Sequence, residues 1–206
     1  MTTSILLIRH GETESNALGM QGRHMGWLDD ELNSTGLKQA ESVALRLAKV
    51  PISAIYSSSS ARALHTAQIM GKSHGLKPVS TPDLREINYG DWEGRKRGEM
   101  RDKYPEIHRQ FQIDPMLVTI PGGESFKQVT QRVISVFNDA TGENEGKTLA
   151  LVSHSFPLKI LVVYALGEPY FIWNRFGIGN ASISIIQVND GVPRLITLND
   201  RAHLEA

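Results

Sequence analysis

The sequence predicts an α/β fold, a three-layer sandwich in which a mostly parallel central sheet carries helices on both faces. Two apolar runs, at residues 4–8 and 148–152, are continuous rather than alternating, which is typical of strands buried on both faces of a parallel sheet. A third strand is expected at 52–56. Because each of the three runs leads into a helical pattern, parallel strands connected by helices are indicated.

A loop and two packing helices are expected in the first half of the chain. Residues 17–30 are rich in Gly and Met and show no hydrophobic period, which indicates a loop. We expect this loop to lie over the ligand site described below. Thr35 can cap the next helix, whose apolar residues share one face and which ends near Pro51. Ser60 is a natural N-cap for the following helix, and this places Arg62 in its first turn.

The second half contains a charged excursion. After a short strand at 78–81 and a Gly-punctuated loop, residues 95–121 form a charged, helical stretch that two prolines interrupt. We expect this stretch to be a small helical cap insertion within one domain spanning residues 1–206. A capping-box pattern at 125–128 starts another packing helix. A hairpin over 181–198 is expected to close the edge of the sheet.

Composition and charge exclude several classes of protein. Lys plus Arg and Asp plus Glu number 22 each, so no basic face for nucleic acid or anionic lipid is indicated. There are no cysteines, which excludes disulfides and thiolate metal sites. The apolar run at 4–8 is much shorter than a signal-peptide core, and no segment approaches the ~20 apolar residues of a membrane span. We therefore expect a cytoplasmic protein without nucleic-acid or membrane partners.

Chemically versatile side chains follow each of the three strands. His10 follows the first, Arg62 the second and His154 the last. Ligand sites of open α/β sheets lie at the carboxyl ends of the strands, so these side chains can meet at one edge. A neighbouring cation disfavours the imidazolium, so Arg9 is expected to keep His10 neutral and nucleophilic. Arg62 would be unfavourable to the dipole of its helix unless an anion were shared there, which indicates a phosphate site.

Five segments in this order resemble the histidine phosphatase superfamily, also called the phosphoglycerate mutase-like or RHG family. They are RHGETESN, SSSSARALHTA, LREINYGDWEG, PGGES and VSH, and they span residues 9–154. The resemblance implies that Glu86 is the proton donor. The resemblance also implies that five further residues contact phosphate or substrate: Thr13, Asn16, Gln21, Gly22 and Ser155. Ser155 stands where the family usually has glycine.

Within this family the chain resembles the phosphatase branch, because the stretch between Gly94 and PGGES is shorter than in the mutases. Its C-terminal part resembles α-ribazole phosphatases and broad-specificity relatives. We expect metal-independent hydrolysis of a small phosphomonoester through a phosphohistidine on His10. Arg9, Arg62 and a cationic His154 would bind the phosphoryl oxygens. A cofactor-dependent phosphoglycerate mutase is the alternative, and a non-catalytic binder of phosphorylated ligands is a second one. No cofactor is expected, and a homodimer is left open.

A metal site is the competing explanation for a cluster of His and Glu residues. The sequence lacks HExxH and similar ligand spacings, and two arginines beside the imidazoles would repel a divalent cation. No metal is therefore expected. A serine nucleophile among the serines at 57–60 is not expected, because no GxSxG motif surrounds them. These serines are interpreted as turn and cap residues. The other histidines are interpreted as ordinary surface or core residues: His24, His65, His74, His108 and His203.

Overall fold

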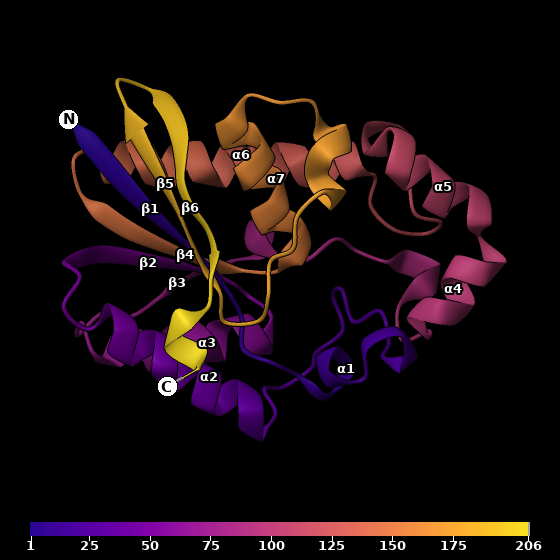
Figure 1. Ribbon diagram of the computed structural model, residues 1–206, viewed down its shortest axis with the longest axis horizontal. Helices are drawn as coiled ribbons and strands as arrows, with labels where there is room; N and C mark the ends of the chain where they lie inside the picture. The colour runs from indigo at the N-terminus through magenta and orange to yellow at the C-terminus, as the bar shows by residue number, and fades with distance from the viewer. Residues whose placement is uncertain (206) are drawn as a thin grey trace.

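A six-stranded sheet forms the centre of the computed structural model, which describes residues 1–205 (Figure 1). The strand order is β3-β2-β4-β1-β5-β6. The bounds are β1 (Thr2–Arg9), β2 (Ile52–Ser58), β3 (Val79–Thr81), β4 (Thr148–Ser153), β5 (Ile183–Asn189) and β6 (Val192–Asp200). Strands β3, β2, β4 and β1 are mutually parallel, and the antiparallel hairpin β5–β6 pairs with β1. The predicted sheet and its closing hairpin are confirmed.

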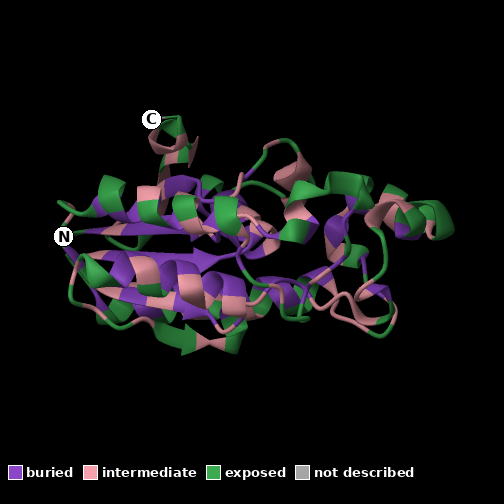
Figure 2. Cartoon of the chain, turned by 90° about the horizontal axis from the view of Figure 1, so that it is seen from below, coloured by how far each residue is buried: buried purple, intermediate pink, exposed green. Residues whose placement is uncertain are grey.

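The described residues form seven α-helices. They are α1 (Glu14–Ala17), α2 (Ser34–Leu47), α3 (Ala61–Lys72), α4 (Arg97–Lys103), α5 (Pro105–Ile113), α6 (Phe126–Glu143) and α7 (Ser155–Leu166). Helices α2 and α3 lie on one face, and α6 and α7 lie on the other (Figure 1). Figure 2 shows the strands buried between these layers, with exposed residues on the outer sides of the helices. The three-layer prediction is confirmed.

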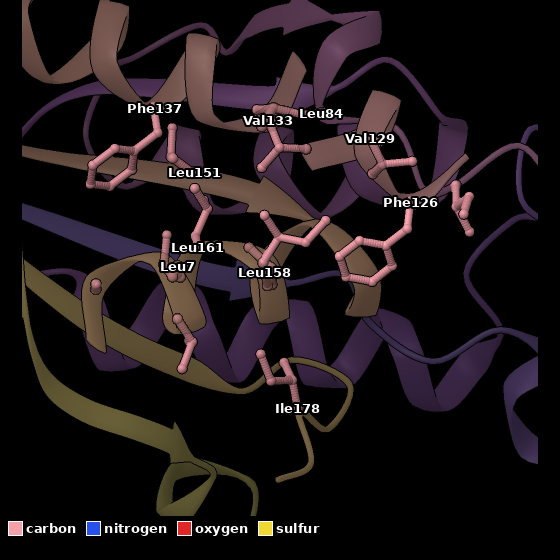
Figure 3. Close-up of a cluster of buried hydrophobic side chains, with 14 of the residues drawn as sticks. Leu7, Leu84, Phe126, Val129, Val133, Phe137, Leu151, Leu158, Leu161 and Ile178 are labelled. Carbon is pink, nitrogen blue, oxygen red and sulfur yellow. The ribbon is translucent and has the colours of Figure 1, made fainter. Parts of the chain in front are cut away.

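Side chains of the continuous apolar run of β1 pack into two hydrophobic clusters, one on each face of the sheet. Leu6 and Ile8 belong to the cluster that includes side chains of α2 and α3. Ile5 and Leu7 belong to the cluster that includes side chains of α6 and α7. Figure 3 shows Leu7 among the apolar side chains of this second cluster, beside Leu161 of α7. Successive side chains of a strand point to opposite faces, so a strand covered on both faces needs apolar residues throughout.

Two helix starts differ in detail from the sequence predictions. Helix α2 is capped by Asn33 instead of Thr35, because the Asn33 side chain accepts a hydrogen bond from the Gly36 N–H at 2.8 Å. Ser60 does precede α3, but its hydroxyl makes no capping hydrogen bond. The capping box of α6 is confirmed, since Ser125 and Gln128 bond each other's backbone N–H.

The charged excursion lies beyond the carboxyl ends of the parallel strands, where α4 and α5 form one end of the molecule (Figure 1). Trp92 joins it to the main body by stacking against Tyr104 at 5.4 Å and His108 at 5.5 Å between ring centroids. Its role as a cap stays a prediction. Within residues 1–205, none of the helices combines the length and apolar character needed to cross a membrane.

Candidate active site

The three strand ends deliver their side chains to one cavity of about 640 Å³. Arg9 and His10 come from the end of β1, Arg62 from the first turn of α3 after β2, and His154 from the residue between β4 and α7. Glu86 reaches the same cavity from the loop after β3. The predicted convergence of these five residues is what the structure shows.

The geometry of His10 defines its tautomer. The ring is 3 % exposed, and its Nδ1 atom lies 2.7 Å from the carbonyl oxygen of Gly11. A carbonyl can only accept a hydrogen bond, so Nδ1 carries the proton and Nε2 keeps its lone pair. Burial lowers the pKa of His10 well below its usual value, and the charges of Arg62 and Arg9 lower it further. Both effects favour the neutral form of His10.

Close backbone packing fixes the turn that carries His10. A Cβ atom on Gly11 would lie 2.4 Å from the carbonyl oxygen of Gly36 in α2, so only glycine fits without moving backbone. The N–H of Gly11 also donates to the Thr66 hydroxyl of α3 at 3.1 Å. The N–H of His10 itself donates to the Ser153 carbonyl of β4 at 3.0 Å. Three elements therefore hold the turn.

His154 lies beside His10, with 5.0 Å between the ring centroids. Its Nε2 atom is 2.8 Å from the Ser58 hydroxyl, and its buried Nδ1 atom has no partner among the described residues. Burial lowers the pKa of His154 well below its usual value, and Arg62, His10 and Arg9 lower it further. Burial and these charges favour neutral His154 in the protein alone, and the cationic His154 expected with bound phosphate stays a prediction. Its neighbours are cationic, and a phosphate dianion would be needed to favour the imidazolium.

Arg62 is buried and Arg9 is partly buried, and both donate hydrogen bonds to backbone carbonyls. Arg9 donates to the Ile178 carbonyl at 2.7 Å, whereas its buried Nε has no partner in the described chain. Burial lowers the pKa of Arg9 to about 10, which leaves it charged at neutral pH. Arg62 donates to the carbonyls of Gly26 at 2.9 Å and Leu28 at 3.2 Å. It therefore also holds the loop at the rim of the cavity.

Glu86 is buried in the wall of the cavity. Its Oε1 atom accepts the N–H of Ile87 at 3.0 Å and the N–H of Phe156 at 3.3 Å. Burial raises the pKa of Glu86, opposed by the Ile87 hydrogen bond and by the charges of Arg62 and Arg9. The proton-donor role that the family resemblance implies needs Glu86 to start protonated. Burial in the protein itself favours this state.

The predicted binding residues divide into two groups. Thr13 and Asn16 line the cavity and also cap α1 reciprocally, and Ser155 lines the cavity at the start of α7. Gln21 is exposed and Gly22 is buried against the Ser15 backbone, and neither lines the cavity. The substrate contacts assigned to these two residues stay predictions.

Several cavity residues could not be assigned to the site from the sequence, because they come from loops, from residues 95–121 and from the uniformly apolar helix α7, where no periodic pattern points at the site. They are His24, Tyr89, Arg97, Phe156, Lys159, Trp173 and Asn180. His24 was interpreted as an ordinary residue, yet it is buried in contact with the Tyr89 ring, 4.3 Å between centroids. Burial lowers the pKa of His24 to about 4, aided by Arg97 and His108.

Metal-ligating side chains are not clustered in the described part of the chain. Within residues 1–205, no group of three or more His, Cys, Asp or Glu side chains is arranged to hold a metal ion. The cavity brings together the guanidinium groups of Arg9 and Arg62, the imidazoles of His10 and His154, and the buried carboxyl group of Glu86. Such a set can bind a phosphoryl group, attack it and protonate its leaving group.

Comparisons with known proteins agree with this chemistry. The model of the histidine phosphatase superfamily (branch 1) matches residues 5–201. Phosphoserine phosphatase 1 of Hydrogenobacter thermophilus is 32% identical over 200 residues, which are 97% of this chain and 93% of that protein. The metal-independent phosphoserine phosphatase of Arabidopsis thaliana is 32% identical over 208 residues, 99% of this chain and 84% of that protein.

A solved structure shows the same fold. It is a mutant phosphoserine phosphatase from Entamoeba histolytica in complex with phosphoserine, with a TM-score of 0.86 and 30% identity over 98% of this chain and 99% of that one. The relatives named as phosphatases favour hydrolysis over the mutase alternative. Matched over nearly its whole length, this chain belongs to the histidine phosphatase superfamily (branch 1) and is a phosphatase acting on small phosphorylated metabolites.

Proposed function

We propose that this phosphatase hydrolyses its phosphomonoester without a metal ion, in two in-line transfers with His10 as the nucleophile. One observation carries the proposal. The hydrogen bond from Nδ1 to the Gly11 carbonyl leaves the Nε2 lone pair of a neutral imidazole available in the cavity. Neutral imidazole can attack phosphorus directly, whereas imidazolium cannot.

In the first transfer a bond forms between Nε2 of His10 and phosphorus while the ester P–O bond breaks. Arg9 and Arg62 bind the equatorial oxygens and stabilise the charge spread over them. The phosphate dianion also favours a proton on His154, which then adds a third donor. Glu86 gives its proton to the leaving oxygen, so the alcohol departs neutral and a phosphohistidine remains.

In the second transfer water attacks the phosphohistidine. Glu86, now a carboxylate, takes a proton from this water as the new P–O bond forms and the N–P bond breaks. Inorganic phosphate leaves, His10 returns to its neutral form, and Glu86 is again protonated. Thr13, Asn16 and Ser155 are assigned to phosphate or substrate contacts, supported by their place in the cavity wall.

Small phosphorylated metabolites are the proposed substrates, with phosphoserine supported by the Entamoeba complex and α-ribazole phosphate by the resemblance of the C-terminal part. A cytoplasmic location fits substrates of this kind. A homodimer also belongs to the proposal, supported by the exposed apolar side chains Val192 and Ile196 on the edge strand β6. Light scattering of the purified protein would test the dimer.

The phosphohistidine is the decisive test. Brief exposure to ³²P-labelled substrate in excess chelator should leave acid-labile, base-stable label on wild-type protein. His10→Ala should carry no label, and His65→Ala, which changes a histidine outside the cavity, should label normally. Label on a serine or carboxylate would contradict the proposal. So would activity that chelation abolishes and a divalent cation restores.

A further inference from the structure

Lys159 is a cation in the cavity wall without an acidic partner. It lies on α7 and is partly buried, with its ammonium 4.9 Å from the centroid of the Trp173 ring and 5.8 Å from that of Phe176. None of the ion pairs formed within residues 1–205 includes Lys159. Aromatic faces attract a cation but leave its N–H groups free to bind an anion.

The other cations of the cavity are engaged differently. Arg97 donates to the carbonyls of Ser15 at 3.0 Å and Gly19 at 2.7 Å, so it holds the α1 segment against α4. Arg9 and Arg62 are assigned to the phosphoryl group. Lys159 therefore adds a charge that the transfer of the phosphoryl group does not require.

The position of Lys159 places it on the leaving-group side. It follows Phe156 by three residues and so shares a face of α7 with it, and the Phe156 N–H bonds the carboxyl group of Glu86. The pKa of Lys159 is lowered by burial and by Arg9 and is raised by Glu86, so both groups act on it electrostatically. Since Glu86 protonates the leaving oxygen, a negative group near Lys159 would belong to the departing alcohol.

The surroundings select the kind of anion. Phe156 and Trp173 pack with 4.6 Å between ring centroids and form an apolar wall beside the ammonium, suited to a short carbon chain. A second phosphate dianion would need several donors, whereas one ammonium matches the single charge of a carboxylate. We propose that Lys159 binds a carboxylate on the leaving group, so that phosphomonoesters of small hydroxy acids are the preferred substrates. This inference rests on the proposed function of the site.

Two substrates of matched size test the proposal. 3-Phosphoglycerate and glycerol 3-phosphate differ in having a carboxylate or a hydroxymethyl group at the same carbon. Wild-type kcat/KM should favour 3-phosphoglycerate by about 10-fold or more, the range for a charged hydrogen bond. Lys159→Met should reduce this ratio to about 1, chiefly through the KM for 3-phosphoglycerate, and Lys159→Arg should retain most of it.

A matched control is Lys103→Met, because Lys103 also lies over an aromatic ring, 5.2 Å from the centroid of Tyr104, but outside this cavity. Its ratio should equal that of wild type. If Lys159→Met lowered kcat/KM equally for both substrates, Lys159 would have a structural role and the proposal would be overturned. A wild-type ratio of 1, or a preference for propanediol bisphosphate, would also overturn it.

The proposed function is monitored in the same preparations. Hydrolysis of p-nitrophenyl phosphate and labelling of His10 do not depend on a carboxylate in the leaving group. If hydrolysis of p-nitrophenyl phosphate and labelling of His10 persist while wild-type kcat/KM is equal for the two substrates, only the role of Lys159 is refuted. If wild-type protein shows neither, the His10 mechanism fails.

Discussion

His10 and Glu86 are both buried, and burial moves their pKa values in opposite directions. It lowers the pKa of the imidazole and raises that of the carboxyl group, because in each case the charged form loses hydration. Both side chains are thereby favoured in their neutral forms. A neutral nucleophile and a protonated acid are the two states with which the first transfer must begin.

The pH dependence of kcat/KM follows from these directions. Because His10 must be unprotonated, activity should fall only at pH values well below 6.5, where its lowered pKa lies. Because Glu86 must be protonated, activity should fall as the pH rises through its pKa, which lies above 4.5. Glu86→Gln should lower kcat for alkyl phosphates by about 10²- to 10⁴-fold and remove the Glu86 limb of the profile.

Aryl phosphates separate this role from a structural one. p-Nitrophenolate leaves without protonation, so Glu86→Gln should slow formation of the phosphohistidine much less with p-nitrophenyl phosphate than with an alkyl phosphate. The burst of p-nitrophenol in stopped flow measures that step. The exposed Glu99 of α4 provides the control variant Glu99→Gln. Equal losses with both substrates would show that Glu86 is not the acid.

At the scale of elements, α6 holds the loop that carries Glu86. Arg132 of α6 donates to the carbonyls of Asp83 and Arg85, each at 2.7 Å, and to that of Glu86 at 3.0 Å. Its guanidinium also pairs with Glu124 at 2.8 Å, with both side chains largely buried. One side chain thus bonds three carbonyls of residues 83–86 and both oxygens of the Glu124 carboxylate, which requires the five donors of a guanidinium.

Arg132→Met should act on both stability and rate. Removing one partner of a buried ion pair costs about 3–5 kcal/mol of unfolding free energy, which urea denaturation measures. Adding Glu124→Gln should restore part of this loss, because the unpaired buried charge is removed. The loosened loop should lower kcat for alkyl phosphates more than the burst with p-nitrophenyl phosphate. A single variant as stable as wild type would contradict the structural role of Arg132.

At the scale of the whole molecule, the mostly parallel sheet and the meeting of His10, Arg62 and His154 could be predicted, because buried parallel strands are continuous in sequence and deliver side chains at their ends. The residue that caps α2 could not be predicted from the sequence. Asn33, Ser34 and Thr35 are all good caps, and the choice depends on packing. The lowered pKa of His154 could not be predicted either, since it depends on burial and on cations that are distant in sequence.

The charged residues of the segment 95–121 bear on the choice between phosphatase and mutase. A mutase must hold the dephosphorylated product by its carboxylate and keep water away from the phosphohistidine. Of Arg97, Arg101, Lys103 and Arg109, only Arg97 lines the cavity. Arg101 pairs with Asp102, and Arg109 pairs with Glu106. This segment therefore contributes little to holding a product.

Net hydrolysis is therefore expected even with a mutase substrate. Lys159 can hold a carboxylate, but one ammonium neither encloses the product nor excludes water from His10. With 3-phosphoglycerate and a catalytic amount of 2,3-bisphosphoglycerate, free phosphate should appear faster than 2-phosphoglycerate. Coupled assays for phosphate and for 2-phosphoglycerate measure the two rates in parallel samples. Rapid formation of 2-phosphoglycerate without stoichiometric phosphate would show that the product turns over within the site, and would assign the chain to the mutases instead.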